Sequence, residues 1–391
     1  MEHHLTEEQR SIRDLARTIA EERVKPVRAK YDEENVFPWD IVQELAKTDL
    51  FRVFIPVEYD GLVESPSMGV TNMCLVTEEL SKACAGIALA FAGTALGTFP
   101  ILLHGSEEQK KKYLPDIAAG KKLAAFGLTE PMAGSDASAQ RTTARRDGDE
   151  YVLNGTKVFI TNGGEADVYT TVALTNPEKG ARGASCFIVE KGTPGFTFGK
   201  KETKMGIHAS VTRELIFDGA RVPKENLLGR EGMGFLVAMK TFDISRPGVG
   251  AQALGIAEGA LEETLKYAHH RHQFGQSIMN FQGLQWMLAD MATQIEAAKA
   301  LIYSLAARID SGDTKDIGHL SAMCKVLASD VAMKVTTDAV QIFGGYGYMT
   351  DYPVEKMMRD AKITQIYEGT NQIQRNVIGS WLAKEAGRLA G

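Results

Sequence analysis

The spacing of apolar residues changes twice along the chain, and this change constrains the fold more than any other feature. Residues 1–120 and 233–391 carry apolar residues at helical spacing, whereas residues 121–232 contain short β-rich runs separated by turns such as Asn154-Gly155. No segment between these runs is long enough to be the helix of a βαβ crossover, which disfavours a doubly wound nucleotide fold. The sequence therefore predicts an α+β protein with an N-terminal helical domain (1–120), a central antiparallel β-domain (121–232) and a C-terminal helical bundle (233–391).

Local signals predict several helix ends. Thr6-Glu7-Glu8-Gln9 and Ser106-Glu107-Glu108-Gln109 are capping-box patterns, which satisfy the free N–H groups of a first helical turn. A helix is also expected to start at Pro38, and two long helices are expected over 281–308 and 317–343.

Composition and charge exclude some classes of function. The 391 residues include 44 basic and 50 acidic side chains, and the net charge of −6 is dispersed, so we expect no nucleic-acid or anionic-lipid partner. The four cysteines are isolated in sequence, which predicts neither a disulfide framework nor a zinc cluster. The polar, acidic N-terminus is unlike a signal or transit peptide, so we expect a cytoplasmic protein.

The uncharged stretch 85–103 is nearly long enough to cross a bilayer. Three glycines, two threonines and Pro100 dilute its apolar side chains, and no basic flank or aromatic belt frames it. We expect a buried helix and no membrane insertion.

The sequence contains none of the common motifs for nicotinamide binding, P-loop phosphate transfer, zinc proteases or serine hydrolases. The run 269–272 holds three histidines, but on a helix only His269 and His272 share a face. We therefore predict no metal site.

Three other segments have the composition of a binding or catalytic site. The segment 126–136 (FGLTEPMAGSD) combines glycines and hydroxyls that could hold a phosphate or a polar ring edge, although an ordinary loop into the β-domain explains it equally well. In the segment 341–348 (QIFGGYGY), three glycines predict a helix end and a tight turn. In 366–371 (IYEGTN), the lone carboxylate of Glu368 has apolar and aromatic neighbours, and burial there would raise its pKa and suit it to act as a general base.

These segments together resemble the acyl-CoA dehydrogenase family, flavoproteins that oxidise acyl-CoA thioesters. The resemblance covers essentially the whole chain, including the helical, β and four-helix-bundle order. It rests on GLTEPMAGSD at 127–136, QIFGGYGYMTDYPVEKMMRD at 341–360, FITNG at 159–163, RHQFG at 271–275 and IYEGTNQIQ at 366–374.

The resemblance implies FAD as the cofactor. Phe159 stands where many relatives have Trp, so an aromatic face for stacking is retained. The matched residues at 271–282 and 341–345 imply contacts to FAD bound by a neighbouring subunit, and hence a homotetramer. The residues implied in cofactor binding are Phe126, Leu128, Thr129, Gly134, Ser135, Phe159, Ile160, Thr161, Arg271, Phe274, Gln282, Gln341, Gly344, Gly345, Thr370 and Gln372.

The resemblance also implies the chemistry. Glu368 would remove the proton next to the thioester carbonyl while hydride leaves to the flavin, with electrons passing to an electron-transferring flavoprotein. The backbone N–H of Glu368 and a flavin ribityl hydroxyl would bind the carbonyl oxygen. The acyl-CoA would be held by Ser135, Asp243, Arg246, Tyr367 and Gly369.

Two residue patterns bear on the substrate. Branched-chain and some long-chain relatives place their base on a helix, at the position of Ser245, and serine cannot accept the proton in this chain. Glutaryl-type relatives use a pocket arginine, whereas residues 83–109 contain no Lys or Arg. We therefore expect a short- to medium-chain or alicyclic acyl-CoA. An oxidase, a reductase working in the enoyl-to-acyl direction, and a non-catalytic scaffold remain as alternatives.

Overall fold

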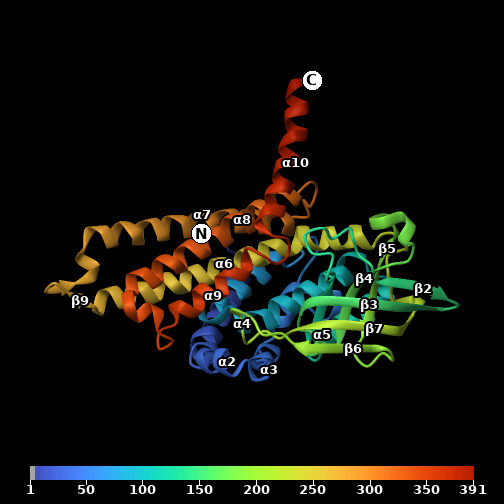
Figure 1. Ribbon diagram of the computed structural model, residues 1–391, viewed down its shortest axis with the longest axis horizontal. Coiled ribbons are helices and arrows are strands. Elements are labelled where there is room, and N and C mark those ends of the chain that lie inside the picture. The colour runs from blue at the N-terminus through green and yellow to red at the C-terminus, as the bar shows by residue number, and fades with distance from the viewer. Residues whose placement is uncertain (1–4) are drawn as a thin grey trace.

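The computed structural model describes residues 5–391, and it has the predicted helical, β and helical order (Figure 1). The N-terminal part begins with α1, extended by one π-helical turn over Ala20–Val24. Both predicted capping boxes are confirmed, at Thr6 before α1 and at Ser106 before α5. The helices of this part are α1 (Glu7–Ile19), α2 (Arg28–Glu34), α3 (Trp39–Lys47), α4 (Val70–His104) and α5 (Glu107–Ala118).

The helix α4 contains the uncharged stretch and forms the centre of the N-terminal core. By length and composition alone it could cross a membrane, yet 78% of its most apolar window is buried within the protein, as expected of a core helix. Non-helical backbone at Cys84 kinks it. At Gly93 and Gly97 the helix approaches the β-domain closely: a Cβ on Gly93 would lie 2.9 Å from the Thr161 methyl group, and one on Gly97 would lie 2.4 Å from the Ala125 nitrogen.

The central part is one twisted sheet with the strand order β6-β7-β3-β2-β4-β5-β8. Most neighbours are antiparallel, as predicted, but β1 pairs with β4 in parallel, and so does one residue of β2. The predicted antiparallel β-domain is therefore present with one parallel strand pair added, whose connection from β1 to β4 is filled by the β2–β3 hairpin and not by a helix. The strands are β1 (Ala124–Gly127), β2 (Thr143–Asp147), β3 (Glu150–Thr161), β4 (Val168–Leu174), β5 (Ala184–Glu190), β6 (Phe196–Lys201), β7 (Thr212–Pro223) and β8 (Leu227–Leu228).

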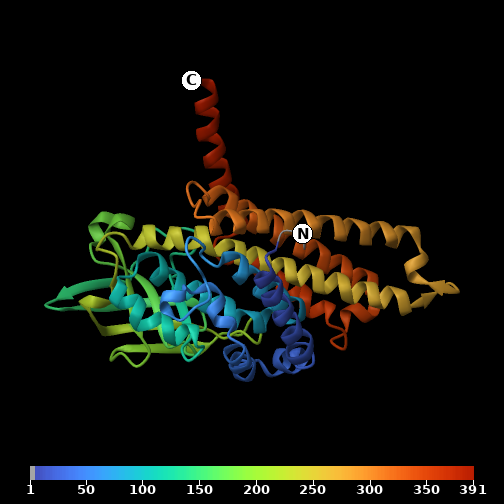
Figure 2. The same cartoon turned by 180° about the vertical axis from the view of Figure 1, so that it is seen from behind.

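The C-terminal part is built on three long helices that lie side by side in Figures 1 and 2. As predicted, α8 ends where the glycine turn begins, and Gly344 has a φ of +63°. The short hairpin β9–β10 forms the far end of this part, away from the sheet, and α10 projects from the body (Figure 1). The elements are α6 (Gly234–His270), β9 (His272–Gln273), β10 (Gln276–Ser277), α7 (Gln282–Asp310), α8 (Gly318–Phe343), α9 (Val354–Thr364) and α10 (Asn371–Ala390).

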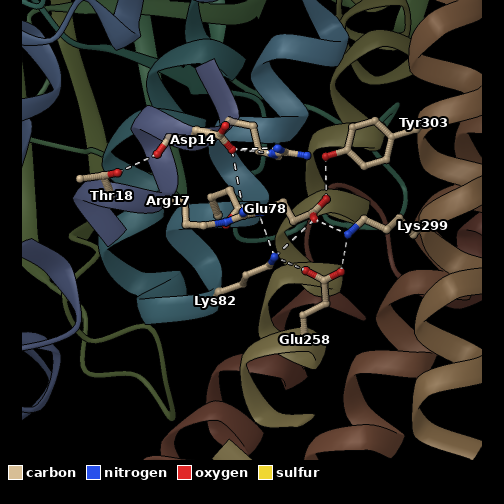
Figure 3. Close-up of polar contacts among 10 residues, drawn as sticks. Asp14, Arg17, Thr18, Glu78, Lys82, Glu258, Lys299 and Tyr303 are labelled. Atoms are coloured by element: carbon tan, nitrogen blue, oxygen red, sulfur yellow. Dashed lines mark hydrogen bonds and ion pairs between the residues drawn. The ribbon is translucent and has the colours of Figure 1, made fainter. Parts of the chain in front are cut away.

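A cluster of charged side chains, the interdomain charge cluster, joins the two helical parts where α1, α4, α6 and α7 meet (Figure 3). Lys299 Nζ of α7 lies 2.9 Å from a Glu78 oxygen of α4 and 2.6 Å from a Glu258 oxygen of α6. Lys82 Nζ lies 2.7 Å from the other Glu258 oxygen, and Tyr303 donates a 2.6 Å hydrogen bond to Glu78. Glu79 binds Arg17 of α1, which fixes the first helix to the same cluster.

Candidate active site

A cavity of about 490 Å³ lies between the sheet, α4, α6 and the turn that connects α9 to α10. The apolar wall comes from α4, which contributes Leu89, Ala92, Leu96 and Phe99. The opposite wall comes from α6 and the connecting turn, which contribute Phe242, Asp243, Ser245, Arg246, Tyr367, Glu368 and Gly369. The loop after β1 and the end of β3 also line the cavity, so segments distant in sequence converge on one space.

Glu368 reaches this cavity from a turn with an unusual backbone. Its φ is +51° and that of Gly369 is +90°, in the left-handed region that favours glycine. Ser245 of α6 donates a 2.6 Å hydrogen bond to a Glu368 carboxylate oxygen, and Arg246 Nε lies 3.4 Å from the Glu368 carbonyl oxygen. The site therefore holds both the side chain and the backbone of Glu368.

Burial raises the pKa of Glu368, as the sequence analysis predicted. The hydrogen bond from Ser245 and the positive charges of Arg246 and Lys325 oppose this rise but do not cancel it. A carboxylate with a raised pKa is a stronger base than an ordinary one, and it remains ionised at moderately alkaline pH. The arrangement is suited to removing a proton from a carbon acid.

The loop after β1 is anchored by a buried ion pair. Lys157 Nζ of β3 lies 2.7 Å from a Glu130 oxygen and donates a hydrogen bond to the Leu128 carbonyl oxygen at 3.1 Å. The same Glu130 carboxylate accepts hydrogen bonds from the backbone N–H groups of Arg141 and Thr142, so it closes the loop at its far end. Burial lowers the pKa of Lys157 to about 8 even beside this carboxylate. These contacts fix the loop, and its Thr129 and Ser135 line the cavity.

The end of β3 presents an aromatic ring at the cavity. Phe159 is 68% exposed, with a φ of +60°, beside a register shift between β3 and β7. An exposed phenylalanine in the left-handed region is unfavourable without a ligand to contact. Next to it lie the Thr129, Ser135 and Thr161 side chains, which can pair with polar ring edges.

The structure brings together only part of the predicted site. The cavity is lined by the predicted residues Phe126, Leu128, Thr129, Gly134, Ser135, Phe159, Ile160, Thr161, Asp243, Arg246, Tyr367, Glu368 and Gly369. The cavity does not include the predicted residues Arg271, Phe274, Gln282, Gln341, Gly344, Gly345, Thr370 and Gln372.

Most of the second group lies near the far end of the helical bundle. There the Arg271 guanidinium packs over the Tyr346 ring at 5.2 Å from its centroid, and Phe274 is 93% exposed beside β9. Thr370 instead caps α10 by accepting a hydrogen bond from the Ile373 N–H. Within one chain, therefore, Arg271 and Phe274 do not reach the cavity.

Sequence reasoning missed several residues of the site. Gln252 lines the cavity and contacts the Tyr367 hydroxyl, and Phe242 packs edge to face on Phe126. Lys157 and Lys325 hold the cavity loops from behind. Helical periodicity marks Phe242 and Gln252 only as core positions, and no local signal distinguishes a buried lysine from a surface one.

Comparison with known proteins agrees with this geometry. Three protein-family models match the chain in order: the N-terminal domain of acyl-CoA dehydrogenase over residues 6–121, the middle domain over 125–220 and the C-terminal domain over 232–383. The chain is 48% identical to a solved butyryl-CoA dehydrogenase from Megasphaera elsdenii, with a TM-score of 0.94 over 97% of this chain and 99% of that one.

Two further relatives are similar over their full length. One is a chain in the solved structure described as the electron transferring flavoprotein of Acidaminococcus fermentans, with 52% identity and a TM-score of 0.94 over 98% of this chain and 99% of that one. The other is an acryloyl-CoA reductase (NADH) from Anaerotignum propionicum, 49% identical over 98% of this chain and 96% of the relative.

The fold and cavity define a flavin-dependent oxidoreductase, with an exposed aromatic ring, hydroxyl donors and one base facing a common space. The chain belongs to the acyl-CoA dehydrogenase family. Its cofactor is FAD. The residues present fit this group, because the Phe159 ring offers a stacking face, Thr129 and Thr161 offer hydrogen bonds to ring edges, and Gly134 leaves open space at the loop.

Proposed function

We propose that this protein is an FAD-dependent dehydrogenase that introduces an α,β double bond into a short- to medium-chain or alicyclic acyl-CoA. The observation that carries the proposal is the Glu368 carboxylate, which lies in the cavity with a raised pKa and a hydrogen bond from Ser245. The bound flavin supplies the two-electron acceptor. The expected cytoplasmic location remains a prediction.

Glu368 takes the proton from the carbon next to the thioester carbonyl. Ser245 fixes the carboxylate orientation from α6, so little reorganisation is needed when the proton moves. The Glu368 backbone N–H is the proposed donor to the carbonyl oxygen, where negative charge develops as the proton leaves. Arg246 and Asp243 at the edge of the cavity are the proposed contacts for the polar part of the substrate.

The cavity walls support a compact, uncharged acyl group. The α4 wall is apolar, and among the described residues that line the cavity Arg246 is the one cation. Because no cation lies among the described α4 residues that line the cavity, nothing on that wall is suited to a second, distal carboxylate. This composition disfavours a dicarboxylic substrate.

We also propose an electron-transferring flavoprotein as the partner and a homotetramer as the functional assembly. Support for the partner comes from the Acidaminococcus fermentans structure described above. Support for the assembly comes from Arg271 and Phe274, whose family counterparts bind FAD although here they lie away from the cavity.

The acryloyl-CoA reductase relative favours a second candidate, in which the same site works in the enoyl-to-acyl direction. The base position suits both directions, because a protonated Glu368 can return the proton that the carboxylate removed. The direction is then decided by the electron donor or acceptor.

An anaerobic bleaching series tests the function and the substrate class together. The purified protein, with FAD bound, is mixed with CoA esters from C4 to C16, with an alicyclic ester and with glutaryl-CoA. We expect the fastest loss of flavin absorbance with C4 to C8 or the alicyclic ester. Fastest bleaching with C16 or glutaryl-CoA would reverse the substrate assignment, and no bleaching with any ester would favour the scaffold alternative.

Mixing the reduced protein with oxygen, an electron-transferring flavoprotein or an enoyl-CoA separates the remaining alternatives. Rapid reoxidation by the flavoprotein and slow reoxidation by oxygen are expected of a dehydrogenase. Rapid reoxidation by oxygen indicates an oxidase, and fast turnover with enoyl-CoA and a reduced nicotinamide through the partner indicates a reductase.

A further inference from the structure

The turn that carries Glu368 rests on one face of α8. Lys325 Nζ donates hydrogen bonds to the Gly369 carbonyl oxygen at 2.9 Å and to the Asn371 side-chain oxygen at 2.8 Å. One helical turn further on, Ser329 accepts a 2.9 Å hydrogen bond from the Asn371 amide group. The neighbouring Asp330 accepts hydrogen bonds from Asn371 at 2.8 Å and from the Gln365 amide at 2.7 Å.

Lys325 is the unusual member of this face, because its side chain is 0% exposed. Within the part of the chain that the structure describes, its ammonium group has no carboxylate at ion-pair distance, and both its acceptors are neutral oxygens. A buried charge without an ion pair costs free energy that a methionine of similar length would avoid. A purely structural support for the turn would therefore not require a cation at this position.

We propose that Lys325 is a positioning residue for the catalytic base: its ammonium group holds the Gly369 carbonyl and the Asn371 side chain, and places a positive charge behind the Glu368 carboxylate. This inference rests on the proposed function of Glu368. Lys325 does not line the cavity, so it acts through Glu368 and not on the substrate.

The hydrogen bonds of Lys325 stabilise a backbone conformation that is costly by itself. A glutamate at φ +51° persists only where its surroundings hold it. Lys325 holds the next carbonyl, and Gln374 Nε2 donates to the Glu368 and Gly369 carbonyl oxygens at 3.0 and 2.9 Å. Without Lys325 the turn keeps the hydrogen bonds from Gln374 and Arg246, so we expect a folded protein with a less well placed carboxylate.

The charge of Lys325 acts on the same carboxylate. Its positive charge lowers the pKa of Glu368, against the effect of burial. Burial in turn lowers the pKa of Lys325 to about 7. The other charged or titratable groups that face this pair are Arg246 of α6, Asp330 of α8 and the Tyr367 hydroxyl.

The test is the pH dependence of flavin bleaching by saturating butyryl-CoA in Lys325→Met and Lys325→Gln. Removing the positive charge raises the pKa of Glu368, so a higher pH is needed to ionise the base. We expect the acidic limb of the pH–rate profile to move to higher pH by about one unit, equivalent to a tenfold weaker acid. The half-saturating butyryl-CoA concentration should change by much less than the rate, because Lys325 does not touch the substrate.

The two variants separate charge from geometry. Lys325→Gln keeps a hydrogen-bond donor for the turn, so its plateau rate at high pH should exceed that of Lys325→Met while its acidic limb stays shifted. Lys334→Met is the matched control: it is the same substitution on α8, but on a 53% exposed lysine paired with Asp338. It should leave both the rate and the limb unchanged.

An acidic limb that stays at the wild-type pH in folded, FAD-containing Lys325→Met would overturn the inference. If that variant does not fold, the limb of Lys325→Gln decides the question in the same way. The proposed function fails by a different result, namely bleaching by Glu368→Gln at a near-normal rate. An inactive Glu368→Gln together with unshifted Lys325 variants therefore rejects the positioning role alone.

Discussion

At the scale of single residues, the proposed reaction depends on the Glu368 carboxylate, whose surroundings both raise its pKa and fix its orientation. Burial disfavours the ionised form of Glu368, while Ser245 and two nearby cations favour it. The balance leaves the pKa raised, and therefore the carboxylate is a better proton acceptor than an exposed glutamate. The hydrogen bond from Ser245 adds direction, because a carboxylate held at 2.6 Å by a helix side chain cannot rotate freely.

Glu368→Gln removes the proton acceptor and keeps the shape of the side chain. A positioned base typically contributes about 10²- to 10⁴-fold to the rate, so we expect butyryl-CoA turnover to fall by at least about that factor. The variant should remain folded and yellow and should still bind butyryl-CoA. Stopped-flow bleaching gives the rate, and circular dichroism and flavin absorbance give the folded, loaded fraction.

The control is Glu385→Gln on α10, where the carboxylate pairs with the exposed Arg388. It should keep the wild-type rate. If Glu368 served only as an ionic support for the fold, its variant would lose stability and keep its rate per folded molecule, and that pattern would contradict the mechanism.

At the scale of elements, the interdomain charge cluster fixes the helices that line the cavity. The α4 wall and the α6 wall meet through Lys82 and Lys299, each of which contacts a carboxylate from either helix (Figure 3). Burial and the neighbouring Glu258 raise the pKa of Glu78 to about 7, whereas that of Glu258 is lowered by both lysines. The cluster therefore depends on having both cations.

Lys299→Met should destabilise the protein by about 3–5 kcal/mol, because it leaves Glu78 and Glu258 buried with Lys82 alone. The excess negative charge raises the carboxylate pKa values further. The folded variant then keeps protons that the unfolded chain has released, so its free energy of unfolding falls as pH rises. The difference from wild type should therefore grow between about pH 5 and 8. Urea unfolding at several pH values measures it.

Arg308→Met on the same helix provides the comparison, because Arg308 pairs with Asp313 at the surface. It should change stability by less than about 1 kcal/mol at every pH. A Lys299→Met deficit that is equally small, or that shrinks as pH rises, would show that the cluster does not stabilise the fold as described.

The same scale shows how far the sequence can be interpreted. Capping at Thr6 and Ser106 and the end of α8 at Gly344 depend on residues three or four positions apart, and these predictions are confirmed. The parallel pairing of β1 with β4 and the hydrogen bond from Lys325 to Gly369 each join segments some 40 residues apart. No local sequence pattern predicts either contact. Glu368 was predictable because its apolar neighbours are adjacent in sequence.

At the scale of the whole molecule, the predicted FAD contacts lie in two separated places. The cavity is lined by residues of the sheet. Arg271 directly precedes β9, which lies at the far end of the bundle (Figures 1 and 2). A second copy that places its far end at the first copy's cavity would bring both groups onto one cofactor. FAD binding and assembly should then depend on each other.

Arg271→Ala should lower the FAD content of the purified protein and weaken its assembly, because a guanidinium pairs bidentately with phosphate oxygens. The ratio of flavin to protein absorbance and the mass from light scattering measure the two effects. Arg308→Ala, at the end of α7 away from β9, should change neither the FAD content nor the mass. A stable monomer with one FAD per chain, in wild type or variant, would contradict the shared site.

The glycines of α4 limit how this substrate pocket can diverge. Gly93 and Gly97 bring the helix so close to the sheet that any side chain there would collide with Thr161 or with the backbone at Ala125. The depth of the pocket can therefore change by substitution at Leu89, Ala92 or Leu96, which line the cavity without this contact, but not at the glycines. We expect relatives that keep both glycines to vary the depth of this pocket at such positions, while the spacing between helix and sheet stays constant.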